Sequence, residues 1–98
     1  MRASRANKVD ANQAAIVKAL EKTGATVQSL GSVGDGCPDL LVGRLGVTLL
    51  LEVKGKKGKT TEDQEEWFSW WRGDGVWIVR DEYEAMEVVL KLTQEGGR

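Results

Sequence analysis

The sequence predicts a small α/β domain in which one mixed β-sheet is flanked by helices. Two observations lead to this fold class. Short runs of strand-forming residues are separated by glycine-rich turns, and segments with apolar residues at helical spacing lie before, between and after those runs. The expected order is helix, strand, strand, strand, helix, strand, helix, which favours an α/β sandwich around the sheet.

The first helix and strand are expected over residues 10–30. From residue 10 to residue 23 apolar side chains recur at helical spacing, and Gly24 then ends the pattern as a helix C-cap does. Residues 25–30 read as a strand. The glycine-rich loop over residues 31–36 would let its backbone approach a ligand closely, and a flexible connection is the alternative.

A β-hairpin is expected next. Residues 39–42 and 47–53 are apolar runs rich in strand formers. Gly43-Arg44-Leu45-Gly46 lies between them and carries glycines at both ends of a turn. This pattern of residues predicts two antiparallel strands joined by four turn residues.

The register of this hairpin follows from the length of its turn. If the four turn residues are unpaired, Val42 faces Val47. Counting outward then puts Asp39 opposite Leu50, with Glu52 as its diagonal neighbour on the same face. Diagonal neighbours lie roughly 7–8 Å apart at the backbone, which is close enough for two carboxylates to share one divalent ion.

The remaining elements are two helices and a strand. They are expected at residues 61–71 (helix), 76–79 (strand) and 81–92 (helix). Thr61 and Gln64 fit a capping box, in which the hydroxyl binds the Gln64 amide and the glutamine side chain reaches back. Asp81 is expected to cap the final helix, with Glu84 three residues on.

The chain reads as one domain. We assign residues 9–93 to it, with a flexible basic arm over residues 1–8 and a short tail over residues 94–98. The 98 residues, of which 41% are hydrophobic, can bury one small core, and association with a second chain would help so short a domain.

The composition excludes several kinds of site. One cysteine and no histidine allow neither an internal disulfide nor a zinc site with four ligands. Cys37 has no histidine to activate it, so we interpret it as a small filler residue. With no signal-like apolar segment near the start, we expect a cytoplasmic protein without membrane contact. We also expect no small-molecule organic cofactor.

Lysines cluster just after the hairpin. The net charge of −1 gives no overall attraction to nucleic acid, so any attraction must be local. The cluster comprises Lys54, Lys56, Lys57 and Lys59, and four carboxylates between residues 62 and 66 cancel it in the total. We expect Lys56, Lys57 and Lys59 to bind nucleic-acid phosphates, and a solvated loop is the alternative.

Asp39, Glu52 and Lys54 have the chemistry of a metal-dependent nuclease. Hydrolysis of a phosphodiester needs a nucleophilic water and a way to hold the developing charge, and Mg²⁺ or Mn²⁺ between two carboxylates can supply both. Lys54 lies on the same face as Glu52 and would orient that water or neutralise charge. The alternative is a turn aspartate and an exposed Glu-x-Lys strand face.

These residues resemble a known family. Gly36 to Val42, Leu51 to Lys54, Gly58 and Gln64 are similar to the VRR-NUC branch of the PD-(D/E)XK nuclease superfamily, and the similarity extends roughly over residues 12–84. The resemblance implies a restriction-endonuclease-like sandwich. It also implies metal-dependent endonuclease activity, with Mg²⁺ or Mn²⁺ as cofactor.

The resemblance further assigns roles to individual residues. Asp39 and Glu52 would be metal ligands, and Val53 would offer its main-chain carbonyl to the metal. Lys54 would be the catalytic lysine, and Gln64 the site glutamine on the following helix. For Gln64, local helix capping explains the residue equally well.

Small members of this family, often from phages, resemble homodimeric enzymes that cut four-way (Holliday) DNA junctions. The resemblance therefore implies branched DNA as the partner and a homodimer as the assembly, with action in a bacterial host if the chain is phage-encoded. The alternative is a nucleic-acid-binding module that keeps the fold without turnover. Loss of cutting in EDTA would separate the two.

The first helix departs from the family pattern. Relatives commonly carry a glutamate there that reaches the metal, whereas this chain has Asp10, Asn12 and Gln13. Asn12 and Gln13 are candidates for contact with the metal through water. The alternative is an exposed polar position on an amphipathic helix.

Four aromatic residues crowd the helix after the lysines. They are Trp67, Phe68, Trp70 and Trp71, and a single helix face can cover only some of them. Trp67 and Trp71 are candidates for the core. Trp70 and Phe68 are candidates for a dimer contact or for stacking on nucleic-acid bases.

Overall fold

The computed structural model describes residues 5–94 of the chain, with side chains from residue 11 onward. Its elements are α1 (Arg5–Lys22), β1 (Thr26–Ser29), β2 (Leu40–Arg44), β3 (Val47–Val53), α2 (Glu62–Trp70), β4 (Val76–Val79) and α3 (Glu82–Leu92). This order confirms the predicted α/β class and the predicted sequence of elements. Among the described residues, no helix is long and apolar enough to cross a membrane.

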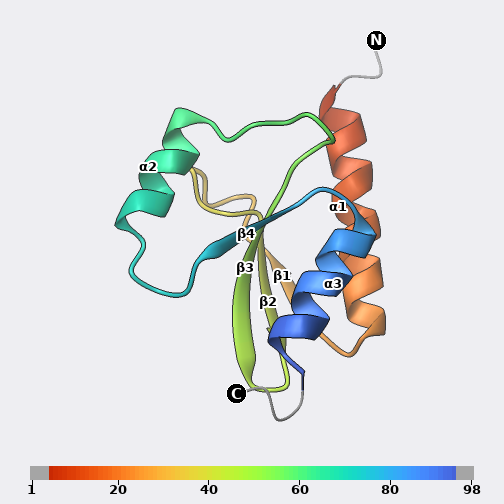
Figure 1. Ribbon diagram of the computed structural model, residues 1–98. Coiled ribbons are helices and arrows are strands. Elements are labelled where there is room, and N and C mark those ends of the chain that lie inside the picture. The colour runs from red at the N-terminus through yellow and green to blue at the C-terminus, as the bar shows by residue number, and fades with distance from the viewer. Residues whose placement is uncertain (1–4, 95–98) are drawn as a thin grey trace.

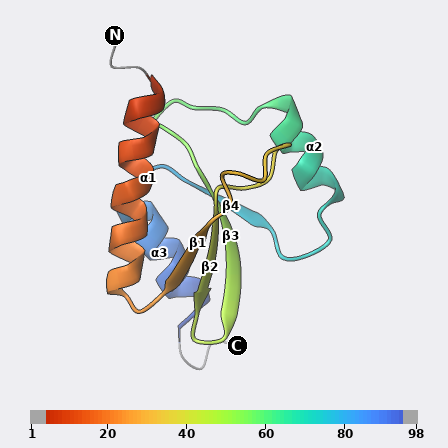
Figure 2. The ribbon, with the colours of Figure 1, turned by 180° about the vertical axis from the view of Figure 1, so that it is seen from behind.

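The four strands form one mixed sheet in the order β1-β2-β3-β4. The first three strands are antiparallel neighbours, and β4 runs parallel to β3. The helices α1 and α3 lie beside each other on one side of the sheet, and α2 stands on the other side (Figure 1). The view from behind shows the same arrangement (Figure 2).

The core lies between one face of the sheet and the pair α1 and α3. Alternate residues of the central strands are buried there, because successive side chains of a strand point to opposite faces. The fully buried apolar side chains are Ile16, Leu20, Leu40, Val42, Leu51, Val79, Ala85 and Val89. The opposite face of β3 carries Leu50 and Glu52, which therefore look toward α2.

The hairpin turn is shorter than predicted. Arg44 pairs with Val47, so only Leu45 and Gly46 are unpaired, and both have positive φ angles of 51° and 81°. Two consecutive positive φ angles are typical of a type I′ turn, which matches the twist of the flanking strands. The four-residue turn and its register were wrong because Leu45, which has no special turn propensity, adopts the left-handed conformation.

The correct register brings the two carboxylates closer. Leu40 pairs with Leu51, so one step further along the ladder Asp39 falls level with Glu52 and not with Leu50. Directly opposed residues have Cβ atoms about 4.5–5.5 Å apart, less than the diagonal spacing. The structure thus favours a shared ligand for Asp39 and Glu52 more strongly than the predicted register did.

The first helix begins earlier than predicted. It starts at Arg5, so residues 5–8, which the sequence predicts in a flexible arm, are helical. Residues 1–4 and 95–98 lie outside the described residues. The later elements match closely. Thr61 caps α2, β4 covers residues 76–79, and Asp81 caps α3, which ends at Leu92 as predicted.

Arg44 fastens the hairpin to the ends of both core helices. Its Nε donates to the carbonyl of Thr23, 3.1 Å away, and its Nη1 donates to Thr93 Oγ1, 2.9 Å away. Thr23 follows α1 and Thr93 follows α3. One guanidinium therefore joins three elements at the end of the sheet opposite to Asp39 and Glu52.

Candidate active site

Asp39 is fixed by hydrogen bonds to two strands. Its carbonyl accepts from the amide of Leu30, 2.8 Å away, just beyond β1. Its Oδ2 accepts from the amide of Val53, also 2.8 Å away, at the end of β3. Pro38 before it is fully buried. The carboxylate is thus held just before the start of β2, next to the last residue of β3.

Glu52 is a buried carboxylate. Its residue is only 2% exposed, although it lies on the face of the sheet away from the core. Oε2 accepts from Gln64 Nε2, 2.7 Å away, and lies 3.4 Å from Lys54 Nζ. Oε1 is buried and has no hydrogen-bond partner among the residues whose side chains are described.

Gln64 joins the site to the start of α2. Its Nε2 donates to Glu52, and its Oε1 accepts from Lys54 Nζ at 2.7 Å and from the Thr61 amide at 3.0 Å. Its own amide donates to Thr61 Oγ1, 3.2 Å away, which completes the capping box. Helix capping and contact with the site, which the sequence left as alternatives, are both made by this one side chain.

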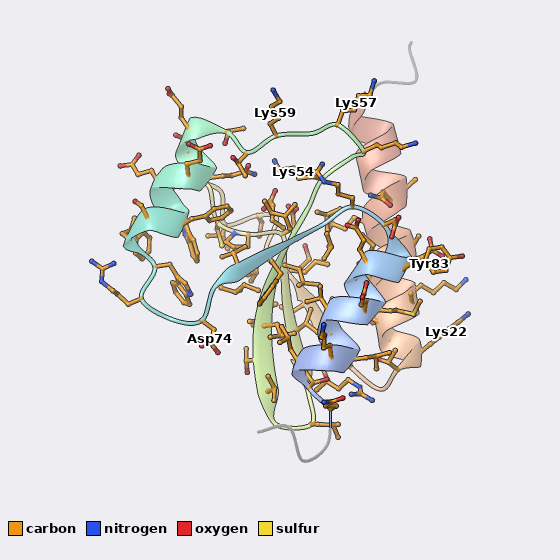
Figure 3. All side chains as sticks on the ribbon, in the orientation of Figure 1. Lys22, Lys54, Lys57, Lys59, Asp74 and Tyr83 are labelled. Carbon is orange, nitrogen blue, oxygen red and sulfur yellow. The ribbon has the colours of Figure 1, made fainter. Side chains whose placement is uncertain are left out.

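Lys54 lies beside Glu52 and Gln64 at the upper end of β3 (Figure 3). Its amide donates to the carbonyl of Val79, 3.0 Å away, which continues the parallel pairing one residue past the strand. Its side chain is 13% exposed. Lys57 and Lys59 lie above it on the loop to α2, and with Lys56 they are exposed.

Gly36 brings the loop before Asp39 against the first turn of α2. Its φ is +85°, and a Cβ added there would lie 2.2 Å from the carbonyl oxygen of Asp63. Only glycine allows this approach. The sequence indicated close approach of this loop to a ligand, whereas the structure shows close approach to the residue before Gln64. The contact helps to place Gln64 beside Glu52.

The acid–base state of Glu52 is unusual. Burial, and then the charge of the neighbouring Asp39, raise the pKa of Glu52 to about 7, although Lys54 opposes the shift. A buried carboxylate next to another carboxylate, with one unpartnered oxygen, is an unfavourable arrangement in a metal-free protein. A divalent cation would remove this cost, and hard oxygen ligands are what Mg²⁺ prefers. Asp39 and Glu52 therefore fit such an ion.

The structure shows no hydrogen bond from the other predicted side-chain ligands, Asn12 and Gln13, to Asp39 or Glu52 among the described residues. Asn12 Nδ2 donates to the carbonyl of Arg80, 3.0 Å away, and Gln13 lines a hollow along α1 with Val17 and Glu21. Among the residues whose side chains are described, no group of three or more His, Cys, Asp or Glu gathers to hold a metal. The carbonyl of Val53 and the side chains of Asn12 and Gln13 stay predictions as metal contacts.

Cys37 lies close to the carboxylates but is not suited to be a nucleophile. It is half-buried, and its amide donates to the carbonyl of Gly34, 3.1 Å away. Burial, and then the charges of Glu52 and Asp39, raise the pKa of the thiol. A raised pKa keeps the sulfur protonated and unreactive near neutral pH, in line with a filler role.

The aromatic residues of α2 form a cluster outside the core. Helix α2 has no buried residue at all. Trp67 stacks on Trp71 with ring centroids 4.9 Å apart and an interplanar angle of 19°, and Trp70 lies 5.2 Å from Trp67 and is 54% exposed. Trp67 and Trp71 are half-buried, and Trp71 also lines a hollow with Leu41 and Leu50 of the sheet. Both are candidates for the core by sequence, and the structure leaves both outside it.

Comparison with known proteins supports the fold. A solved structure described as "VRR_NUC domain" matches with a TM-score of 0.66 and 28% sequence identity, over 84% of this chain and 94% of that chain. No family model and no curated protein matches the chain. The structural match confirms the VRR_NUC-like fold that the motif predicted, and this fold implies a nuclease of the PD-(D/E)XK type.

Gly36 can be tested against Gly34, which also has a positive φ but has nothing within 4 Å of an added Cβ. Gly34→Ala should cost about 1 kcal/mol of unfolding free energy, because only backbone strain is introduced. Gly36→Ala should cost about 2–4 kcal/mol, because the Cβ also collides with the backbone of α2. Urea unfolding of both variants measures the difference. Equal losses would contradict the contact.

The raised pKa of Glu52 predicts how metal-free stability depends on pH. Between its ordinary pKa of 4.5 and about 7 the folded protein binds the proton that the unfolded chain releases, so stability should fall as pH rises through this window. The loss should be on the order of 2 kcal/mol relative to Glu52→Gln, which cannot titrate. Urea unfolding in EDTA at pH 5 and pH 8 measures it. The same pH dependence in both proteins would contradict the assignment.

Proposed function

We propose that this chain, a VRR_NUC-like α/β domain, is a Mg²⁺- or Mn²⁺-dependent DNA endonuclease that hydrolyses phosphodiester bonds. The observation that carries the proposal is the placement of Glu52, Lys54 and Gln64 in one hydrogen-bonded group beside Asp39. A buried carboxylate with an unpartnered oxygen is costly, and such cost is common where a ligand completes the site.

Asp39 and Glu52 are the proposed metal ligands, with the main-chain carbonyl of Val53 as a third. The amide of Val53 holds Asp39 Oδ2 in place, which leaves the other carboxylate oxygen to face the ion. Oε1 of Glu52 is the corresponding free oxygen on the opposite strand. A divalent cation held there supplies a water of lowered pKa and stabilises charge on the phosphoryl oxygens.

Lys54 is the proposed catalytic lysine. Gln64 Oε1 and Glu52 Oε2 hold its ammonium group at the edge of the carboxylate pair, where the side chain remains partly exposed. From this position the ammonium can orient the attacking water or neutralise charge that develops on the phosphate. Gln64 is the proposed positioning residue, because its amide binds both Glu52 and Lys54.

The proposed substrate is branched DNA, with a four-way junction as the first candidate. Lys56, Lys57 and Lys59 are exposed on the loop next to the site and would contact the phosphate backbone. The likeness to the VRR_NUC domain supports DNA as the substrate, and the branched form rests on the resemblance of the motif to small junction-cutting enzymes. A non-catalytic DNA-binding module is the second candidate, favoured by the lack of a third acidic ligand among the described side chains.

The direct test is cleavage of a labelled four-way junction, a linear duplex and a single strand, each with Mg²⁺, Mn²⁺ or EDTA. We expect metal-dependent cutting of the junction, abolished by Asp39→Ala, which also loses the metal. Lys54→Ala should retain Mn²⁺ binding in calorimetry but lower the cleavage rate by about 10²-fold or more. Normal cutting by Lys54→Ala would refute its role, and binding without cutting in any metal would favour the non-catalytic module.

We also propose that the chain forms a homodimer through the aromatic cluster of α2, defined as Trp67, Trp70 and Trp71. Trp70 is exposed beside the half-buried stacked pair, and an exposed tryptophan supported by other aromatic rings is typical of interface anchors. Trp70→Ser should shift the protein from dimer to monomer in light scattering coupled to size-exclusion chromatography. Tyr83→Ser is the matched control, because Tyr83 is 71% exposed on α3, away from α2 (Figure 3). A dimer that survives Trp70→Ser would contradict this interface.

A further inference from the structure

Arg80 connects the end of β4 to the turn that carries the lysines. Its Nη1 donates to the carbonyl of Gly55 at 2.6 Å and to the carbonyl of Gly58 at 2.9 Å, with a longer contact of 3.5 Å to the carbonyl of Lys56. These residues form a tight turn, since the amide of Gly58 donates to the carbonyl of Gly55 at 3.1 Å. One guanidinium thus binds carbonyls at the beginning, middle and end of the turn.

The main chain of Arg80 is itself held from two sides. Its amide donates to Glu84 Oε1, 2.8 Å away in the first turn of α3. Its carbonyl accepts from Asn12 Nδ2, 3.0 Å away on α1. The carboxylate of Glu84 therefore binds the backbone of Arg80 and leaves the guanidinium for the turn. Both core helices fix the base of a side chain that reaches toward the site.

The turn over residues 55–58 also lies against Lys54. A Cβ added at Gly58 would be 3.5 Å from both Cβ and Cδ of Lys54, so the backbone of the turn packs along the lysine stem. The same turn carries Lys56 and Lys57 with their side chains exposed. The position of the turn therefore affects Lys54 in the site and the neighbouring Lys56 and Lys57.

Arg80 also keeps its positive charge available. Among the residues whose side chains are described, the ion pair within 4.0 Å is that of Lys54 with Glu52, and Arg80 binds carbonyls instead of a carboxylate. All three carbonyls accept from the same terminal nitrogen, Nη1, which the rigid planar guanidinium places at a fixed point, whereas a lysine ammonium sits on a flexible four-carbon stem.

From these contacts we infer that Arg80 is a positioning residue. It holds the turn over residues 55–58 so that Lys54 is supported along its stem and Lys56 and Lys57 meet the phosphate backbone together. The part of this inference that concerns DNA rests on the proposed function, whereas the part that concerns the turn does not. The two parts are tested separately.

The turn is tested by limited proteolysis with trypsin, which cuts after lysine and arginine, with the cuts after individual lysines followed separately. In Arg80→Met, cleavage after Lys56 and Lys57 should accelerate by about tenfold. The hydrogen bonds of the guanidinium are absent in this variant, so the turn can open locally without the cost of breaking them. Cleavage after Lys22 in the same sample should not change. Arg72→Met is the matched control, because Arg72 is exposed and, among the described residues, its side chain binds carbonyls of its own helix end.

Arg80→Lys shows, in the same experiment, whether the positive charge or the shape of the arginine side chain protects the turn. It retains the positive charge, but its shorter and flexible side chain does not place a nitrogen at the position of Nη1, so it should behave like Arg80→Met. Unchanged cleavage after Lys56 and Lys57 in Arg80→Met would refute the inference. A uniform acceleration that includes Lys22 would refute it as well, because it would show a general loss of stability.

The DNA arm is a double-mutant cycle on duplex binding, measured by anisotropy in EDTA over a range of salt concentrations. Lys57→Ala should weaken binding by about fivefold in the wild-type background and by less than about twofold in Arg80→Met. Full additivity would refute the joint positioning of the lysines. Coupled binding in a chain that never cleaves DNA would leave Arg80 in its role and refute only the proposed catalysis.

Discussion

The site depends on the side-chain amide of Gln64. This group donates to Glu52 and accepts from Lys54 while it also accepts from the amide of Thr61 at the start of α2. Helix α2 has no buried residue, and this amide and the close approach of Gly36 to Asp63 are two of its connections to the rest of the fold, beside the hollow that Trp67 and Trp70 line with residues 33–35. The start of α2 and the site are therefore linked through one side chain.

The register of the sheet places the two carboxylates of the site, Asp39 and Glu52. The two-residue turn at Leu45 and Gly46 places Asp39 level with Glu52 across β2 and β3. The apolar residues on the opposite face fix that register, because a slip of one residue would expose the core side chains. Burial of the core on one face thus determines the distance between the two carboxylates on the other.

Much of this arrangement could be predicted from the sequence. The order of elements, the cap at Thr61 and the last strand follow from local periodicity and turn chemistry, which act over a few residues. The hairpin register could not, because the left-handed conformation of Leu45 is imposed by strand pairing. The contacts of Arg80 also escaped prediction, since they join residues 22 to 25 positions apart through a side chain with no motif.

The most direct test of the account is the location of a divalent cation. A crystal of the protein grown with Mn²⁺ would show the ion by its anomalous scattering. We expect one peak between Asp39 and Glu52, within coordination distance of an oxygen of each carboxylate. A structure at saturating Mn²⁺ with no peak between these two residues, or with the ion bound elsewhere, would contradict it.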